Sequence, residues 1–199
     1  MKNLTRIICL TLVVLLGSTG TSWGADYQKG LAAHQSGDFA TALREWKPLA
    51  EQGYVYAQSN LGQMYHNGEG VLQNYKTAFK WYTLAAEQGH VSAQYNLGVM
   101  YFQGEGVPQD FKTAVKWYTL AAEQGDAYAQ YNLGQMYRKG EGVSKDYVYA
   151  HMWWNIAASN GNENGGKLRD EVAEEMYTRQ INKAQDLARE CVAKKYKGC

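Results

Sequence analysis

Apolar side chains between residues 110 and 147 recur with the spacing of two helices that each bury one face. The first stripe occupies positions i, i+3, i+4 and i+7 of a helix and comprises Ala114, Trp117, Tyr118 and Ala121. The second stripe comprises Ala129, Leu133, Met136 and Tyr137. Asp110 and Asp126 precede the stripes as expected N-caps, and Gly140 follows the second one as an expected helix end. The pattern predicts two helices joined by a tight turn.

This helix pair returns along the chain with a period of 36 residues. Residues 112–147 match residues 76–111 at 26 positions. A glycine recurs where each first helix must end, and we expect it to be left-handed there: Gly53, Gly89, Gly125 and Gly161. A tryptophan recurs as Trp81, Trp117 and Trp153 and is predicted to fill the space between helices. A period of this length is typical of a stacked solenoid.

The N-terminal side of the repeats departs from the pattern. Glu45 takes the tryptophan position of the first unit and Trp46 follows it, so we expect a degenerate end unit. Asp26 to Gln35 is predicted to form a half-unit helix that ends near Gly37 and covers the stack. Asp38 is predicted to cap a further helix over Phe39 to Glu51.

The C-terminal side also departs from it, because residues 162–166 replace the usual helix start after Gly161. Two closing helices are predicted, over Leu168 to Met176 and, with Thr178 as its cap, over Arg179 to about Lys195. The expected organisation is a capping helix at 25–37, a repeat region at 38–161 and closing helices at 162–199. The repeat region divides into units at 38–75, 76–111 and 112–147 and a half unit at 148–161.

The first 24 residues have the pattern of a secretory signal peptide. Lys2 and Arg6 precede a short apolar run at residues 7–16, and small residues follow up to Gly24. The run is about half of the ~20 residues that a membrane-spanning helix needs, which favours cleavage between Gly24 and Ala25 over an uncleaved anchor. The mature chain is therefore expected to be periplasmic or secreted, without membrane insertion.

Composition indicates one globular domain, since 45% of the 199 residues are hydrophobic. Without residues 1–24 the chain has 18 basic and 19 acidic residues. This balance gives no general attraction to nucleic acid, so no nucleic-acid partner is predicted.

Candidate chemistry is sparse. The four histidines stand at unrelated repeat positions without metal-ligand spacing and are interpreted as structural: His34, His66, His90 and His151. Glu69, Glu105 and Glu141 return in each glycine loop that links two units, which favours a structural or capping role over catalysis. The glycine-rich loops lack the Lys-Ser/Thr ending of a phosphate cradle. The sequence therefore predicts no catalytic residue, no metal and no cofactor.

Cys191 and Cys199 are candidates for a disulfide in an oxidising compartment. A continuous helix would hold their Cα atoms about 12 Å apart, so pairing requires the chain to leave the helix near Lys195. Their spacing is not that of a Cys-x-x-Cys redox pair, which disfavours a redox function. Whether they pair within the chain stays open.

A longer motif carries a resemblance to a known family. It comprises Ala78, Trp81, Ala85, Ala86, Gln88 and Gly89, then Ala93 to Tyr101, and finally Gly104, Gly106, Val107, Asp110 and Phe111. This pattern resembles the Sel1-like repeat family, a relative of the tetratricopeptide repeat. The resemblance implies an all-α fold, a right-handed α/α superhelix, that serves as a scaffold or adaptor in protein complexes. Exported bacterial members resemble periplasmic regulators and factors of envelope assembly.

The leading hypothesis is a non-catalytic scaffold that binds a protein or peptide on the concave face of the superhelix. Six outward positions are the candidates for that face, with plain solvated surface as the equal alternative: Lys80, Thr83, Glu87, Lys116, Thr119 and Glu123. Positions that vary between units, such as His66, Phe102 and Arg138, could also hold specificity.

Two other functions are alternatives to this hypothesis. A cysteine-rich branch of Sel1-like proteins is linked to β-lactam binding or hydrolysis, but its repeats hold disulfides and the repeats of this chain hold no cysteine. The other alternative is a purely structural part of an envelope complex.

Overall fold

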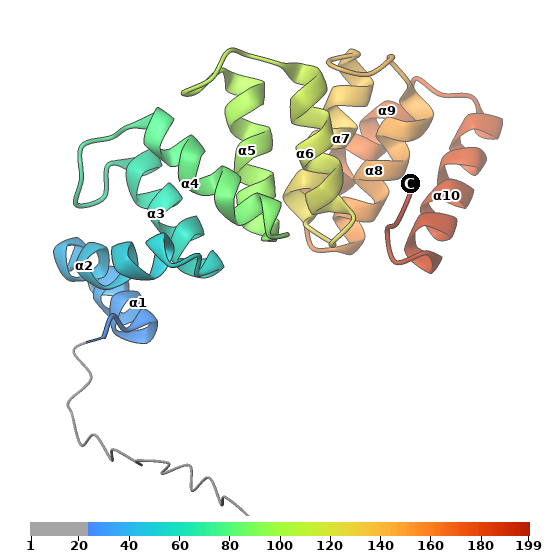
Figure 1. Ribbon diagram of the computed structural model, residues 1–199. Coiled ribbons are helices and arrows are strands. Elements are labelled where there is room, and N and C mark those ends of the chain that lie inside the picture. Colours follow the sequence, from blue (N-terminus) through green and yellow to red (C-terminus); the bar gives the residue numbers. More distant parts are fainter. Residues whose placement is uncertain (1–23) are drawn as a thin grey trace, which may run out of the picture.

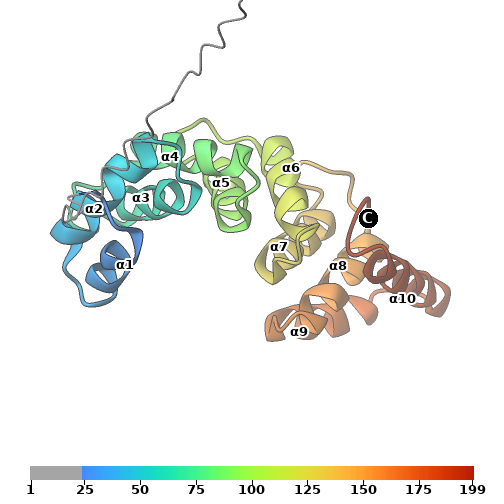
Figure 2. The same cartoon turned by 60° about the horizontal axis from the view of Figure 1, so that its bottom comes forward.

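The computed structural model describes residues 24–199, which form a row of α-helices that curves into an arc (Figures 1 and 2). No β-strand occurs in this part of the chain. The helices are α1 (Tyr27–Gln35), α2 (Phe39–Glu51), α3 (Val55–Asn67), α4 (Tyr75–Glu87), α5 (Val91–Gln103), α6 (Phe111–Ala122), α7 (Ala127–Lys139), α8 (Tyr147–Ser159), α9 (Glu163–Ala173) and α10 (Thr178–Ala193). The expected signal peptide, residues 1–24, lies outside the described residues but for Gly24.

Most helices begin and end where the polar pattern predicts. The Asp38 carboxylate accepts from the Thr41 backbone N–H at 3.0 Å, and that of Asp126 accepts from Ala129 at 2.7 Å. Each caps the first turn of its helix. The predicted left-handed glycines are confirmed, for example at Gly125, whose φ is +90°. The glycine gives the chain the reversal that joins two antiparallel helices.

Adjacent helices pack in pairs through a glycine and a large aromatic ring. A Cβ on Gly98 of α5 would lie 2.5 Å from the Tyr118 ring of α6, so only glycine allows this close packing. The same contact joins α1 to α2, α3 to α4 and α7 to α8 through Gly30 and Trp46, Gly62 and Tyr82, and Gly134 and Trp154.

The prediction of a degenerate first unit is therefore wrong. Trp46 is not displaced, because it stands in register with Tyr82 and Tyr118 and makes the first pair regular. Consequently α1 belongs to a complete helix pair rather than to a half unit. Trp81 and Trp117 are half-buried and fill space between the helices of neighbouring units, as predicted. Trp81 contacts the core of α1 to α3, and Trp117 contacts that of α4 and α5.

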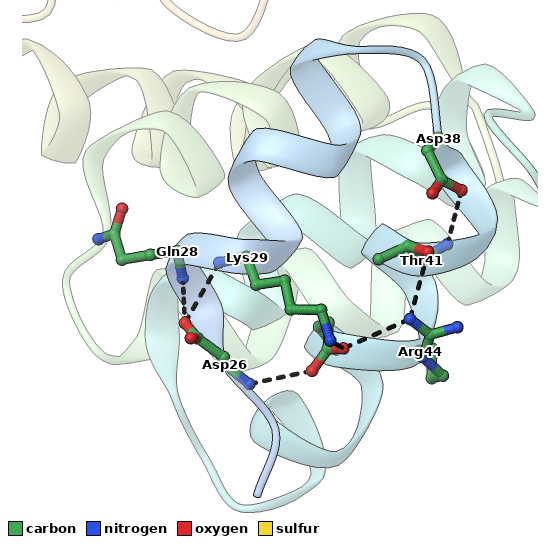
Figure 3. A network of polar contacts seen from close by, with 7 residues as sticks. Asp26, Gln28, Lys29, Asp38, Thr41 and Arg44 are labelled. Carbon is green, nitrogen blue, oxygen red and sulfur yellow. Dashed lines mark hydrogen bonds and ion pairs between the residues drawn. The ribbon is translucent and has the colours of Figure 1, made fainter. Parts of the chain in front are cut away.

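Charged groups close the N-terminal pair (Figure 3). Lys29 lies 2.8 Å from the carboxylate of Glu45, which also accepts from the Asp26 backbone N–H at 3.1 Å. The hydrogen bond from Lys29, followed by that from Asp26, lowers the pKa of Glu45. The glutamate at the predicted tryptophan position thus ties α2 to the start of α1.

Buried amides connect one pair to the next. The Gln94 side chain donates to the Ala86 carbonyl at 3.2 Å and accepts from the Gln124 amide at 2.7 Å. Equivalent bonds occur one unit earlier, at Gln58 and Gln88, and one unit later, at Gln130 and Asn160. Each amide satisfies a helix-end carbonyl that would otherwise be buried without a partner.

The C-terminal helices α9 and α10 both pack against α8 and cover the end of the stack, as predicted. Their bounds differ from the prediction. The helix α9 begins at Glu163, not Leu168, because Asn162 caps it and Gly165 lies inside it against α8. The helix α10 begins at Thr178 itself, and Gln180 accepts from the Tyr177 backbone N–H at 2.9 Å.

Candidate functional site

The arc has an inner side and an outer side. Figure 2 shows α3, α5 and α7 along its concave side and α4 and α6 along its convex side. The inner helices contact one another directly, α3 with α5 and α5 with α7. The α3/α5 and α5/α7 junctions therefore lie on the concave side of the arc.

A groove of about 310 Å³ lies at the junction of α5 and α7. Its floor contains Tyr118 and Met136, which are buried. Its walls are apolar and comprise Tyr95, Val99 and Phe102. Its polar lining comprises Gln103, Asn132, Gln135 and Lys139. The groove combines an apolar depression with amide groups and one cationic side chain, Lys139.

The two tyrosines of the groove are neutral hydrogen-bonding groups. Burial, together with the neighbouring Tyr95, raises the pKa of Tyr118, while a hydrogen bond with Asn132 opposes the rise. Burial and then the Asp126 carboxylate raise the pKa of Tyr95. Both phenols thus keep their protons at physiological pH and offer hydroxyl groups rather than charge.

The loop acids connect successive helix pairs through histidines. Glu69 lies 2.8 Å from Nε2 of His34, and Glu105 lies 2.9 Å from Nε2 of His66. This contact supports the structural role predicted for the loop acids. The interpretation that the histidines stand at unrelated positions is wrong for these two. Gly30 and Gly62 are 32 residues apart, whereas later equivalent glycines are 36 apart, and this shorter first unit hides their equivalence.

Phe102 takes the position of His66 one unit later. Its ring packs against Phe111 with a centroid distance of 5.3 Å, whereas the His66 ring packs against Tyr75. One carboxylate oxygen of Glu141, the third loop acid, is buried without a hydrogen bond and lies 3.9 Å from Lys139. The phenylalanine thus supplies an apolar wall of the groove where the preceding junction has a histidine–glutamate pair.

The six residues predicted for the concave face lie elsewhere. Lys80, Thr83 and Glu87 belong to α4, and Lys116, Thr119 and Glu123 belong to α6 or its C-cap. Figure 2 shows α4 and α6 on the convex side of the arc. The prediction that these six residues lie on the concave face is therefore wrong. The Thr83 and Thr119 hydroxyls donate to the Phe79 and Val115 carbonyls of their own helices, each at 2.8 Å. Glu123 accepts a hydrogen bond from the backbone of Gly198 at 3.0 Å.

Sequence reasoning identified few of the groove residues. Phe102 stood out only as a position that varies between units, and Val99, Gln135 and Lys139 were not singled out. The signal for them is available in the repeat itself. In the alignment of the repeats, Val99 corresponds to Gln63 and Gln135, and Lys139 corresponds to Asn67 and Gln103. Such changes on a fixed helical frame mark outward positions.

Cys191 and Cys199 are joined in a disulfide, with their Cα atoms 5.4 Å apart. The chain leaves α10 after Ala193, and Lys195 and Tyr196 take left-handed backbone conformations with φ of +53° and +66°. This reversal brings Cys199 back to the helix, in the manner that the spacing of the two cysteines requires.

Between residues 24 and 199, no group of three or more His, Cys, Asp or Glu side chains could hold a metal ion. Over the same residues no helix has the length and hydropathy needed to cross a membrane. The groove itself offers phenols, amides and one lysine.

The repeated helix pairs and their curvature define an α-solenoid repeat protein. The family model of the Sel1 repeat matches residues 55–90, 91–126 and 127–162, which together are more than half of the chain. The chain therefore belongs to the Sel1 repeat family. Each matched unit joins an inner helix to the following outer helix, which is also how the glycine–aromatic contacts pair them.

Solved structures of related proteins agree with this assignment. A Sel1 repeat protein from Oxalobacter formigenes is 34% identical, with a TM-score of 0.69 over 72% of this chain and 59% of that chain. A protective antigen of uropathogenic Escherichia coli with an SLR fold is 30% identical, with a TM-score of 0.53 over 85% of this chain and 45% of that chain. The chain thus spans about half of the length of these relatives. No curated protein matches it. Sel1 repeat proteins are generally scaffolds for protein–protein interaction.

Proposed function

We propose that this protein is a non-catalytic interaction scaffold of the bacterial cell envelope and that it holds an extended segment of a partner protein in the groove between α5 and α7. The groove is the observation that carries the proposal. Its floor accepts an apolar side chain over Tyr118 and Met136. Its amides match the donors and acceptors of a peptide backbone, which has one of each per residue.

The positive charge of Lys139 favours an acidic residue in the bound segment. Lys139 is exposed and is the cationic side chain of its lining. Its ammonium lies 3.9 Å from Glu141, a distance that leaves it able to pair with a second carboxylate. We therefore propose that the segment carries an apolar residue with an aspartate or glutamate close to it.

Two observations support an envelope location. Residues 1–24 have the pattern of a signal peptide, and the chain carries a disulfide between Cys191 and Cys199. Disulfides persist in oxidising compartments such as the periplasm and are rare in the cytosol. Fractionation of cells followed by N-terminal sequencing tests this part. A mature chain that starts at Ala25 in the periplasm or medium supports it, and an uncleaved cytosolic chain contradicts it.

Photo-crosslinking in intact cells tests the groove. A photoreactive amino acid at Val99 is expected to capture one discrete protein, and sequencing of the cross-linked peptide should find apolar and acidic residues. Lys139→Glu is expected to abolish the capture by charge repulsion. Lys80→Glu on the convex side is the matched control and is expected to leave the capture unchanged. Equal effects of both substitutions would contradict the proposed binding site.

A further inference from the structure

The C-terminal tail, Lys194 to Cys199, folds back onto the edge of the arc where α6 turns into α7. The backbone N–H of Gly198 donates to Glu123 Oε1 at 3.0 Å, and Lys197 Nζ lies 3.6 Å from Glu123 Oε2. The Tyr196 hydroxyl donates to Asn160 Oδ1 at 3.0 Å. The tail therefore binds the rest of the protein through its side chains and backbone, in addition to forming the disulfide.

The Tyr196 ring lies against Gly125. A Cβ on this glycine would be 3.6 Å from the ring, so the flat backbone of the turn provides the contact surface. Three groups thus bind the tail, and we call them the tail site: Glu123, Gly125 and Asn160. They recognise a lysine, an aromatic ring and a phenol hydroxyl, respectively.

The tail site recurs in the two preceding units. At a spacing of 36 residues, Glu123 corresponds to Glu87 and Glu51, and Gly125 corresponds to Gly89 and Gly53. The amide of Asn160 corresponds to those of Gln124 and Gln88. We call these groups the Gly89 site (Glu87, Gly89, Gln124) and the Gly53 site (Glu51, Gly53, Gln88). Both glycines have the left-handed conformation of Gly125, with φ of +87° and +92°.

These two sites are open where the tail site is covered. All six of their residues are exposed, whereas the three residues of the tail site are partly buried. A Cβ on Gly53 or Gly89 would meet nothing within 4 Å. Within residues 24–199 neither Glu51 nor Glu87 forms an ion pair, so both carboxylates are available to a cation.

We propose that the Gly89 and Gly53 sites bind a segment of another protein in which an aromatic residue is followed by a lysine or arginine. Tyr196 and Lys197 of the chain itself bind the tail site, and they are the model for this motif. The aromatic ring would stack on the glycine turn and the cation would pair with Glu87 or Glu51. In the Gly89 site, the Gln124 Nε2 already donates to Gln94 and to the Gly89 carbonyl, which leaves its Oε1 to accept from a tyrosine hydroxyl.

This surface is separate from the groove between α5 and α7, so it goes beyond the function proposed above. The α-solenoid would present two binding surfaces, one in its hollow and one along an edge. Because each edge site offers a small contact, two neighbouring sites would together favour a partner that carries two such motifs.

Titration of the intact protein with the pentapeptide acetyl-Lys-Lys-Tyr-Lys-Gly-amide, followed by the backbone amide signals in NMR spectra, tests the proposal. We expect saturable shifts at Gly53 and Gly89. Glu87→Gln is expected to weaken binding at Gly89 roughly two- to fivefold, the usual range for an exposed ion pair, and to leave Gly53 unchanged. The matched control is Glu174→Gln, an equal charge change at the C-cap of α9, which should alter neither site. A peptide with alanine for tyrosine should lose binding at both.

Three outcomes would overturn the proposal. The first is the absence of shifts at both glycines up to millimolar peptide. The second is shifts that Glu87→Gln or the alanine peptide leaves unchanged. The third is a concentration-dependent shift of Gly53 and Gly89 without peptide, which would assign these sites to a second copy of the chain. Shifts at Val99 and Gln135 instead would place the peptide in the α5/α7 groove, so the two proposals stay distinguishable.

Discussion

Two junctions along the inner side of the arc share one frame and differ in chemistry. At the α3/α5 junction His66 pairs with Glu105 at 2.9 Å, and both side chains are partly buried. At the α5/α7 junction Phe102 holds the histidine position and a groove opens beside it. Both junctions have a buried tyrosine in the same register, Tyr82 in the first and Tyr118 in the second. The comparison teaches that glycine–aromatic pairs build the frame, whereas substitutions at variable positions change the chemistry and shape of each junction.

The largest expected effect comes from truncation of the shared tyrosines. Tyr82→Ala and Tyr118→Ala each remove a buried ring and leave a cavity, so each is expected to lower the free energy of unfolding by about 3–5 kcal/mol. Urea denaturation measures both values. Similar losses would confirm that the two junctions share a frame. A loss below about 1 kcal/mol at either tyrosine would contradict it.

Removal of the disulfide is the next largest change and lies outside both junctions. Cys191→Ser opens the short loop to Cys199 and is expected to lower the free energy of unfolding by roughly 2–3 kcal/mol in the chain-entropy model. It should also expose the tail at Lys194 to trypsin. Binding in the α5/α7 groove should stay unchanged, because the tail forms its hydrogen bonds with Glu123 and Asn160, which do not line the groove. Reduced groove binding would show that the cap and the groove are coupled.

Exchanging the residue types at His66 and Phe102 tests whether this position causes the difference between the two junctions. His66→Phe leaves the partly buried Glu105 carboxylate without its histidine and is expected to lower the free energy of unfolding by about 1–2 kcal/mol. Phe102→His is the reverse change. It offers a partner to Glu141 and polarises the groove wall, so it should weaken binding of the partner segment. Thermal unfolding and a binding titration measure the two effects, and unchanged binding in Phe102→His would remove Phe102 from the site.

The smallest expected effect is a dependence on pH at the start of α5. Nδ1 of His90 accepts from the Ala93 backbone N–H at 3.3 Å, and burial lowers the pKa of His90 below its usual 6.5. A histidine whose pKa is lowered by folding adds stability above its unfolded pKa and loses it as the pH falls through the folded pKa. The free energy of unfolding should therefore fall below pH 6.5 by no more than an N-cap contributes, about 1 kcal/mol.

His90→Asn provides the control for this dependence, since asparagine caps a helix without titrating near neutral pH. The variant should show a flatter stability profile between pH 7 and 5. The equivalent cap of α7 is Asp126, whose pKa burial raises, whereas burial lowers the pKa of His90. A profile that His90→Asn leaves unchanged would assign the acid sensitivity to other groups, such as buried His151.

Much of the fold follows from local patterns in the sequence. The aspartate caps and the glycine turns at Gly53, Gly89, Gly125 and Gly161 act within one turn of chain, so the sequence indicates them directly. The start of α9 was missed because residues 162–166 do not match the usual helix start, and this segment includes Gly165 and Gly166. In the structure they lie in the helix and allow it to approach α8 closely, a contact between elements that local propensity does not contain.

The site was harder to predict because it depends on which helices face inward. In the sequence Tyr118 is one member of a helical stripe, and only the structure shows that it packs against Gly98 of α5. The sequence interpretation therefore assigned the concave face to α4 and α6. It did single out Glu87 and Glu123, and Glu123 does bind a peptide segment, the chain's own tail, although on the edge rather than in the hollow.

The central claim is that the partner binds at the α5/α7 junction and not at the α3/α5 junction. The most direct measurement is an NMR titration of the intact protein with the segment identified by cross-linking at Val99. The account predicts that amide shifts concentrate on residues 95–103 and 132–139, with Gln135 among the largest, while the equivalent Gln63 on α3 does not move. Shifts centred on residues 59–67, or spread over α4 and α6, would contradict it.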